Sequence, residues 1–157
     1  MPMMLGTATP ILDCSLYIPE LKARAKESVL AQIVAVAHQS GAVRGAGPLL
    51  ELLRLRERLG TTALGKGVAV PHARSLTVDR PSLVVARSHR GIEWDAPDGL
   101  PANLILLVLS PGEWGEEAHQ AFIARAVGVA RFQRNRQRLL EAESFAEVAD
   151  VLREAHP

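Results

Sequence analysis

Residues 65–74 read Gly65-Lys66-Gly67-Val68-Ala69-Val70-Pro71-His72-Ala73-Arg74, and this stretch decides how the chain folds. Its apolar run at 68–70 is short and bounded by Gly and Pro, which is typical of a buried strand. Pro71 fixes its own φ angle and restricts Val70, so the backbone that leads to His72 is stiff. Residues that follow buried strands often lie at the mouth of a site. The stretch therefore predicts a strand that delivers one histidine, His72, to a functional site.

Outside this stretch, other short apolar runs predict further strands. They occupy residues 15–18, 82–86 and 104–109, and each is bounded by turn-forming or polar residues. A segment rich in Gly and Pro, residues 91–101, separates the last two runs and predicts a loop. The middle of the chain therefore supplies the sheet.

Apolar residues at helical spacing predict helices on both sides of these strands. They cover residues 26–38, 49–59 and 116–130, and Pro48 is placed as a first helical residue of the second helix. Ser, Phe, Ala and Glu at 144–147 match a capping box that opens a last helix. Helices first, strands in the middle and helices last predict one αβ domain in which helices cover a sheet.

Length and composition exclude several classes of protein. The 157 residues suit a single domain over residues 1–157, with residues 1–10 as a flexible tail. A net charge of +1 is too small to indicate nucleic acid or an anionic membrane as a partner. Cys14 is the only cysteine, which excludes an intrachain disulfide and favours a cytoplasmic protein. The longest apolar run, Leu104 to Leu109, is too short to insert into a membrane.

The segment around His72 resembles a known phosphorylation motif. Arg56-Glu57, then Thr61-Thr62, then Gly65-Lys66-Gly67-Val68-Ala69-Val70-Pro71-His72 follow the order seen in enzyme IIA domains of the bacterial phosphotransferase system. The resemblance is to the mannitol/fructose branch, which includes the nitrogen-regulatory IIA proteins. It implies that His72 accepts a phosphoryl group and that Arg56 lies beside it.

A second match follows the apolar run at 104–109. Ser110-Pro111 comes directly after this run, and His119 follows where the family has a second histidine close to the phosphoacceptor. The resemblance extends from about Leu16 to Leu152. It implies the fold of this branch, an α/β domain with a mixed β-sheet flanked by helices on both faces. It also implies transfer from the histidine phosphocarrier HPr, or its nitrogen-branch relative, to a regulatory target or a IIB protein.

The chemistry of phosphoryl transfer fits these residue types. Such a transfer depends on positioning and on donors to the phosphoryl oxygens. Arg56 offers a planar fork of donors, and His119 offers a ring N–H. Thr61 and Thr62 offer hydroxyl groups. Because donor and acceptor are both imidazoles, we expect neither a metal nor another cofactor. Arg74 is expected to be solvated.

Other functions remain open at this point. Within the family, Pro-His-Ala-Arg at 71–74 favours a regulatory IIA, and the alternative is a sugar-route IIA that passes phosphate to a separate IIB protein. A IIA-like binding module without phosphoryl transfer is a further alternative. Glu116 and His119 are spaced like metal ligands, but no second such pair is visible, so a metal-dependent hydrolase is not favoured. The arginines at 131–138 are expected to form a solvated helix face.

Overall fold

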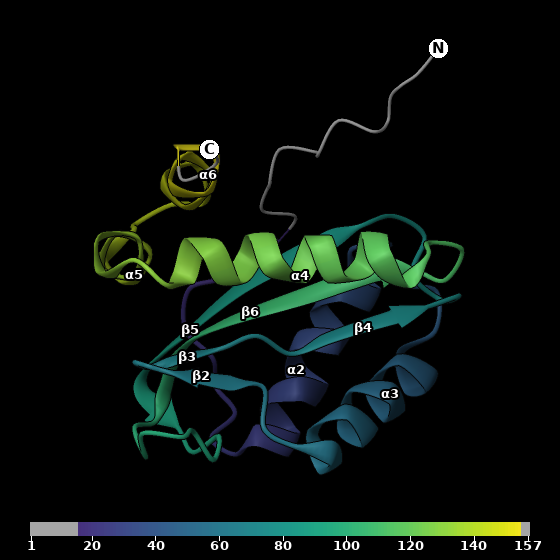
Figure 1. The fold of residues 1–157 in the computed structure, drawn as a ribbon, viewed down its shortest axis with the longest axis horizontal. Coiled ribbons are helices and arrows are strands. Elements are labelled where there is room, and N and C mark those ends of the chain that lie inside the picture. Colours follow the sequence, from purple (N-terminus) through teal and green to yellow (C-terminus); the bar gives the residue numbers. More distant parts are fainter. Residues whose placement is uncertain (1–15, 155–157) are drawn as a thin grey trace.

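Strands β5 (Ser82–Ile92) and β6 (Ala102–Pro111) form a long antiparallel hairpin at the centre of the molecule. A computed structural model describes residues 16–154 of the chain. The other strands extend the hairpin into a mixed six-stranded sheet of order β1-β5-β6-β3-β2, in which β4 also pairs with β6 (Figure 1). They are β1 (Leu16–Ile18), β2 (Ala63–Gly65), β3 (Val68–Ala69) and β4 (His72–Ser75).

Helices cover both faces of this sheet (Figure 1). One face packs against α2 (Lys26–Gln39) and α3 (Ala46–Leu59). The opposite face packs against α4 (Glu116–Ala130), α5 (Gln133–Glu141) and α6 (Phe145–Glu154). The predicted fold class, a mixed sheet flanked by helices on both faces, is therefore confirmed.

The apolar run in β6 contributes to both hydrophobic cores. Successive side chains of a strand point to opposite faces of the sheet. The core under α2 and α3 contains Ile105, Leu107 and Leu109, whereas Leu104, Leu106 and Val108 belong to the core under α4, α5 and α6. A strand that is buried on both faces has no polar alternation, which explains the continuous apolar run in the sequence.

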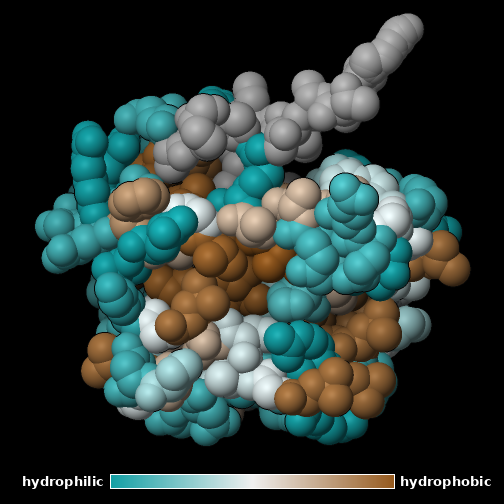
Figure 2. Space-filling view, viewed as in Figure 1, coloured by the Kyte–Doolittle hydropathy of each residue, from teal (hydrophilic) through white to brown (hydrophobic). Residues whose placement is uncertain are grey.

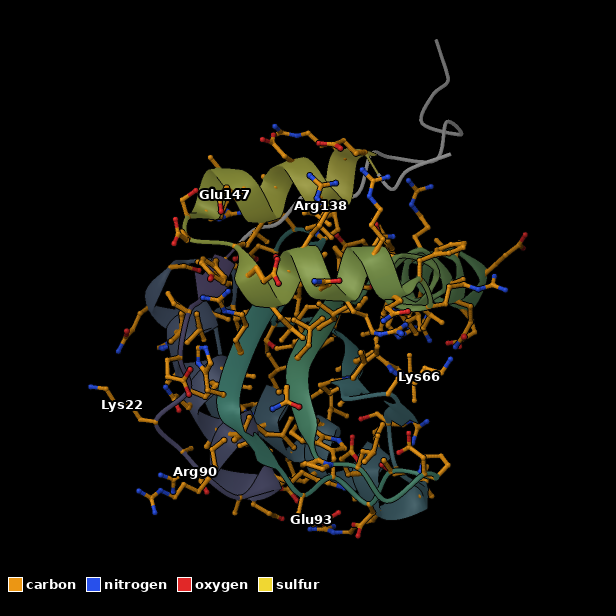
Figure 3. The ribbon with its side chains drawn as sticks, turned by 90° about the vertical axis from the view of Figure 1, so that its left-hand side faces the viewer. Lys22, Lys66, Arg90, Glu93, Arg138 and Glu147 are labelled. Carbon is orange, nitrogen blue, oxygen red and sulfur yellow. The ribbon has the colours of Figure 1, made fainter. Side chains whose placement is uncertain are left out.

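Charged side chains of both signs lie at the two opposite ends of the molecule (Figure 3). Viewed from the side, α5 with Arg138 and α6 with Glu147 lie at one end (Figure 3). Arg90, near the end of β5, and Glu93, just beyond it, project from the opposite end (Figure 3). In the part of the chain that the structure describes, no helix is long and apolar enough to cross a membrane.

Most predicted elements are present, with differences at their ends. The helix predicted at 49–59 begins earlier, at Ala46, so that Pro48 is its third residue. Proline is tolerated there because the first N–H groups of a helix have no partner within the helix. Half of the predicted capping box is present: the backbone N–H of Glu147 donates to Ser144 Oγ at 3.1 Å, whereas the Glu147 carboxylate accepts the N–H of Glu143 instead of that of Ser144. The predicted tail at 1–10 lies outside the described residues.

Strand β4 was not predicted from the sequence. We expected His72 to follow a strand, but it begins one. Pro71 has no N–H, which separates β3 from β4, although its carbonyl still accepts the N–H of Val108 in β6 at 3.0 Å. The stretch from Val68 to Ser75 therefore runs along β6 as one strand that is interrupted at Pro71.

A tight turn at Gly112 carries the chain from β6 to α4. A Cβ atom at this position would lie 2.6 Å from the backbone nitrogen of Leu76 and 2.8 Å from its Cα. The turn thus packs directly on the backbone that follows β4. This contact fixes where α4 begins relative to β4.

We expect Gly112→Ala to destabilise the protein by about 1–3 kcal/mol, because the backbone of Leu76 must move to admit the methyl group. Urea denaturation measures the change. Gly115→Ala is the control in the same connection: a Cβ there meets no atom within 4 Å, so only the smaller cost of alanine at the N-cap of α4 is expected. Equal stability losses in the two variants would contradict this account of the turn.

Candidate functional site

His72 lies on the stretch of strand that runs between α3 and α4 (Figure 1). It pairs in register with Val108 of β6, and among the described strands β4 pairs only with β6. Val70 and Val108 belong to the core under α4, whereas Ala73 belongs to the opposite core. Strand alternation therefore places His72 on the α4 side of the sheet. Its side chain is half-buried.

One hydrogen bond fixes the ring of His72. Its Nδ1 lies 3.0 Å from the carbonyl oxygen of Val70. A carbonyl only accepts, so Nδ1 must carry the hydrogen. In the neutral ring this leaves Nε2 with a free lone pair, which is the state that a nucleophilic histidine needs.

The surroundings of His72 favour its neutral form. Burial lowers the pKa of His72 below its ordinary value, and the positive charge of Arg56 lowers it further. The hydrogen bond to Val70 and the charges of Glu57 and Glu116 act in the opposite direction, but the net pKa shift is downward. A lowered pKa keeps the imidazole uncharged, and therefore nucleophilic, at neutral pH.

His119 lies next to His72. The centroids of the two rings are 5.8 Å apart, and the ring planes are inclined by 57°. His119 belongs to α4 and is 5% exposed. Its Nδ1 lies 2.7 Å from the hydroxyl of Ser110. Burial, then the neighbouring His72, lowers the pKa of His119, so this ring is uncharged at neutral pH as well.

Arg56 reaches the site from the last turn of α3. Its Nη1 donates to the carbonyl of Gly60 at 2.8 Å, which holds the guanidinium against the turn that follows the helix. It takes part in no ion pair among the described residues. After burial, its positive charge is a further cause of the lowered pKa of His72.

The next residue, Glu57, organises the turn between α3 and β2. Its side chain is 7% exposed and lies 3.1 Å from Nζ of Lys26. It accepts the backbone N–H of Thr62 at 3.2 Å and also the hydroxyl of Thr62. This carboxylate therefore connects α2, α3 and the chain entering β2.

Both threonine hydroxyls have partners within the protein. Thr61 donates to the carbonyl of Trp94, and the Thr62 hydroxyl oxygen accepts the indole N–H of Trp94 at 3.1 Å. Thr62 is 5% exposed. Contact of these hydroxyls with phosphate stays a prediction, and it requires their present hydrogen bonds to be exchanged.

Sequence reasoning assigned no role to Ser110 or Glu57. Arg74 is exposed, as expected, and it also donates from Nη1 to the carbonyl of Trp114 at 2.6 Å and lies 3.4 Å from Glu116. It thereby ties β4 to the connection that leads into α4. The sequence offered no signal for this contact, because β4 was not predicted as a strand.

The structure places His72 and His119 side by side, and Arg56 acts electrostatically on His72. Thr61 and Thr62 lie in the turn held by Glu57 and Trp94. Within residues 16–154, no group of three or more His, Cys, Asp or Glu side chains is arranged to hold a metal ion.

Comparison with known proteins assigns the family. Residues 10–155 match the family described as phosphoenolpyruvate-dependent sugar phosphotransferase system, EIIA 2. The chain is 35% identical over 150 residues to a fructose-specific EIIA component of Haloferax volcanii, covering 96% of this chain and 95% of that protein. It is 31% identical over 144 residues to a nitrogen regulatory protein of Bradyrhizobium diazoefficiens, covering 92% and 93%.

Solved structures agree with this assignment. Nitrogen regulatory protein IIA-Ntr from Neisseria meningitidis superposes with a TM-score of 0.78 at 27% identity, covering 87% of this chain and 92% of that one. The Escherichia coli complex of enzyme IIA and phosphorylated enzyme IIB for mannitol matches with a TM-score of 0.71 at 20% identity, covering 87% and 92%, which shows a shared fold. The chain therefore belongs to the EIIA 2 family of the phosphotransferase system, and it is a phosphocarrier component of that system.

We expect Arg56→Gln to raise the pKa of His72, because the lost positive charge is one of the causes that hold it down. An NMR titration of the His72 ring should show its midpoint at a higher pH than in the wild type. Arg56→Lys keeps the charge and should leave the midpoint nearly unchanged. Arg58→Gln is the neighbouring control, since Arg58 is exposed and pairs with Glu51 at 3.9 Å. A midpoint that falls in Arg56→Gln would contradict the electrostatic role.

Proposed function

We propose that His72 is the phosphoacceptor and that the phosphoryl group binds to its Nε2 atom. The observation that carries this proposal is the hydrogen bond from Nδ1 to the Val70 carbonyl, which leaves Nε2 as the nucleophilic nitrogen. The donor is an HPr-like histidine phosphocarrier. We also propose that the protein turns over no free small molecule, because both donor and acceptor are proteins.

The transfer exchanges one phosphorus–nitrogen bond for another. The lone pair of Nε2 attacks phosphorus, the bond between phosphorus and the donor's imidazole breaks, and its electron pair returns to that ring. Nε2 carries no hydrogen at the start, so no proton must leave His72 during attack. Phosphoryl transfer of this kind relies on positioning and on electrostatic stabilisation of the phosphoryl oxygens.

Arg56 and His119 supply that stabilisation in this proposal. Two carboxylates close to the site already have cationic partners, since Glu57 pairs with Lys26 and Glu116 pairs with Arg74. Arg56 has no such carboxylate partner among the described residues, so its charge is available to the phosphoryl oxygens. His119 is close enough to add a ring N–H.

An exposed apolar stripe beside the site fits transient docking of the donor. Leu52, Leu55 and Leu59 lie on the same helix as Arg56 and are 39%, 47% and 85% exposed. Apolar surface is visible over α3 on the face that also shows β4 (Figures 1 and 2). A modest apolar patch with a cation at its edge is suited to a partner that must bind and leave. We place this exchange in the cytoplasm, where such carriers work.

For the onward step we propose regulation of a target protein, as Pro-His-Ala-Arg at 71–74 predicts. The nitrogen regulatory relative supports this role. The second candidate is transfer to a IIB protein, which the fructose-specific relative and the mannitol complex support. In the regulatory role, a phosphoryl group at His72 adds nearly two negative charges beside Arg56 and so changes which partners bind.

Incubation with phosphoenolpyruvate, enzyme I and HPr tests the acceptor. Intact-mass analysis should show that the wild-type protein gains one phosphoryl group and that His72→Ala gains none. His38→Ala changes an exposed histidine on α2 and should be phosphorylated like the wild type. An unphosphorylated wild-type protein would mean that the chain is a binding module.

A second experiment separates the two onward roles. Purified phosphorylated protein is mixed with fructose-type and mannitol-type IIB domains, and loss of the phosphoryl group is followed with time. A regulatory protein should keep its phosphoryl group in both mixtures, because its docking surface is not matched to a IIB partner. Rapid and complete transfer to either domain would instead assign the sugar route.

A further inference from the structure

Ser110 is the last-but-one residue of β6 and lies beneath His119. It pairs in register with Arg74, two residues beyond the pair formed by His72 and Val108. Because side chains of a strand alternate, Val108 and Ser110 point to the same face, toward α4. Ser110 is fully buried, at 0% exposed, in a strand that is otherwise apolar from Leu104 to Leu109.

The hydroxyl of Ser110 has one hydrogen bond among the described residues, and its partner is Nδ1 of His119 at 2.7 Å. A hydroxyl carries one hydrogen and two lone pairs, and a neutral imidazole carries one hydrogen on either nitrogen. If Nδ1 donated to Ser110, the buried hydroxyl hydrogen would have no acceptor, and a buried unpaired donor is costly. If the hydroxyl donates to Nδ1, both the hydroxyl hydrogen and the lone pair of Nδ1 have a partner. The second arrangement is therefore favoured.

We propose that Ser110 is a positioning residue for phosphoryl transfer: its hydroxyl donates to Nδ1 of His119 and thereby holds the imidazole hydrogen on Nε2. This inference rests on the proposed function of His72. The two histidines then have opposite tautomers. The Val70 carbonyl keeps the hydrogen of His72 on Nδ1, and the Ser110 hydroxyl keeps the hydrogen of His119 on Nε2.

Opposite tautomers give the two rings different roles. His72 presents a lone pair that bonds to phosphorus, and His119 presents an N–H that donates to a phosphoryl oxygen. With its Nε2 unprotonated, His119 would present a lone pair that repels that oxygen instead. Ser110 acts only through His119, so it touches neither the phosphoryl group nor the partner.

The tautomer of His119 is read directly from the ¹⁵N signals of its ring. In the wild type, NMR should show hydrogen on Nε2 and a hydrogen-bonded, unprotonated Nδ1. Ser110→Ala should give a mixture of tautomers, and Ser110→Thr, which keeps the hydroxyl, should restore the wild-type spectrum. A single Nε2–H tautomer that persists unchanged in Ser110→Ala would overturn the inference.

Transfer kinetics give a second readout. We expect Ser110→Ala to slow transfer from phosphorylated HPr about tenfold, which is less than the roughly 10²–10³-fold loss on removal of such a donor, because His119 itself remains. Ser110→Thr should recover most of the rate. The matched control is Ser82→Ala, because Ser82 is 1% exposed on the neighbouring strand, pairs in register with Leu109, and donates to the carbonyl of Arg80 at 2.9 Å. An equal loss in Ser82→Ala would assign the effect to packing and overturn the inference.

A double-mutant cycle with His119→Gln tests whether Ser110 affects the transfer rate only through His119. In that background Ser110→Ala should cause no further loss of rate, since the ring through which Ser110 acts is gone. A full additional tenfold loss would contradict the positioning role. These outcomes are distinct from failure of the proposed function: if His72 is never phosphorylated, the relay is wrong, whereas the NMR measurement still reports the His119 tautomer.

Discussion

The hydrogen bond between Nδ1 of His72 and the carbonyl of Val70 is the constraint on which the site depends. It joins residues only two positions apart, so the chain itself orients the ring. Pro71 makes this possible because it stiffens the backbone between them and interrupts the strand. Once Nδ1 is occupied, Nε2 is the only nitrogen left for covalent chemistry. The ring is thus oriented before any partner arrives, and under the proposed function a partner needs only to bring phosphorus to Nε2.

The sheet and α4 determine which residues surround His72. Strand β6 lies beside β4 and places Val108 next to His72 and Ser110 next to Arg74. The turn at Gly112 then returns the chain over β4, and α4 brings His119 to within 5.8 Å of His72. Burial lowers the pKa of both histidines, so two imidazoles can lie side by side without charge repulsion at neutral pH. The burial that brings the two histidines together therefore also keeps both rings uncharged.

Much of the fold was predictable because its signals are local, and part of the site was not because its contacts are tertiary. Three signals can be recognised in the sequence alone: the apolar run of β6, the helical spacing in α2 and α4, and the Pro-His pair. Strand β4 is not, since His-Ala-Arg-Ser has neither apolar content nor strong strand preference. Ser110 and Glu57 matter through partners on other elements, and no spacing rule links them. The role of Arg87 in β5 was also hidden, because its partners lie far away in sequence. It is 8% exposed and donates to the carbonyls of Leu139, Leu140 and Ala142.

Under the proposed function, the distribution of charge around His72 determines how phosphorylation would change the nearby surface. Glu57 pairs with Lys26 and Glu116 pairs with Arg74, whereas Arg56 forms no ion pair with a carboxylate among the described residues. In the free protein that charge lies beside an uncharged ring and an exposed leucine stripe on α3. A phosphoryl group on His72 would pair with Arg56 and leave an excess of negative charge at the edge of the stripe. The surface around the leucine stripe would then attract a cationic partner in the phosphorylated state and an acidic or neutral partner in the free state. Discrimination between the two states therefore requires no movement of the backbone.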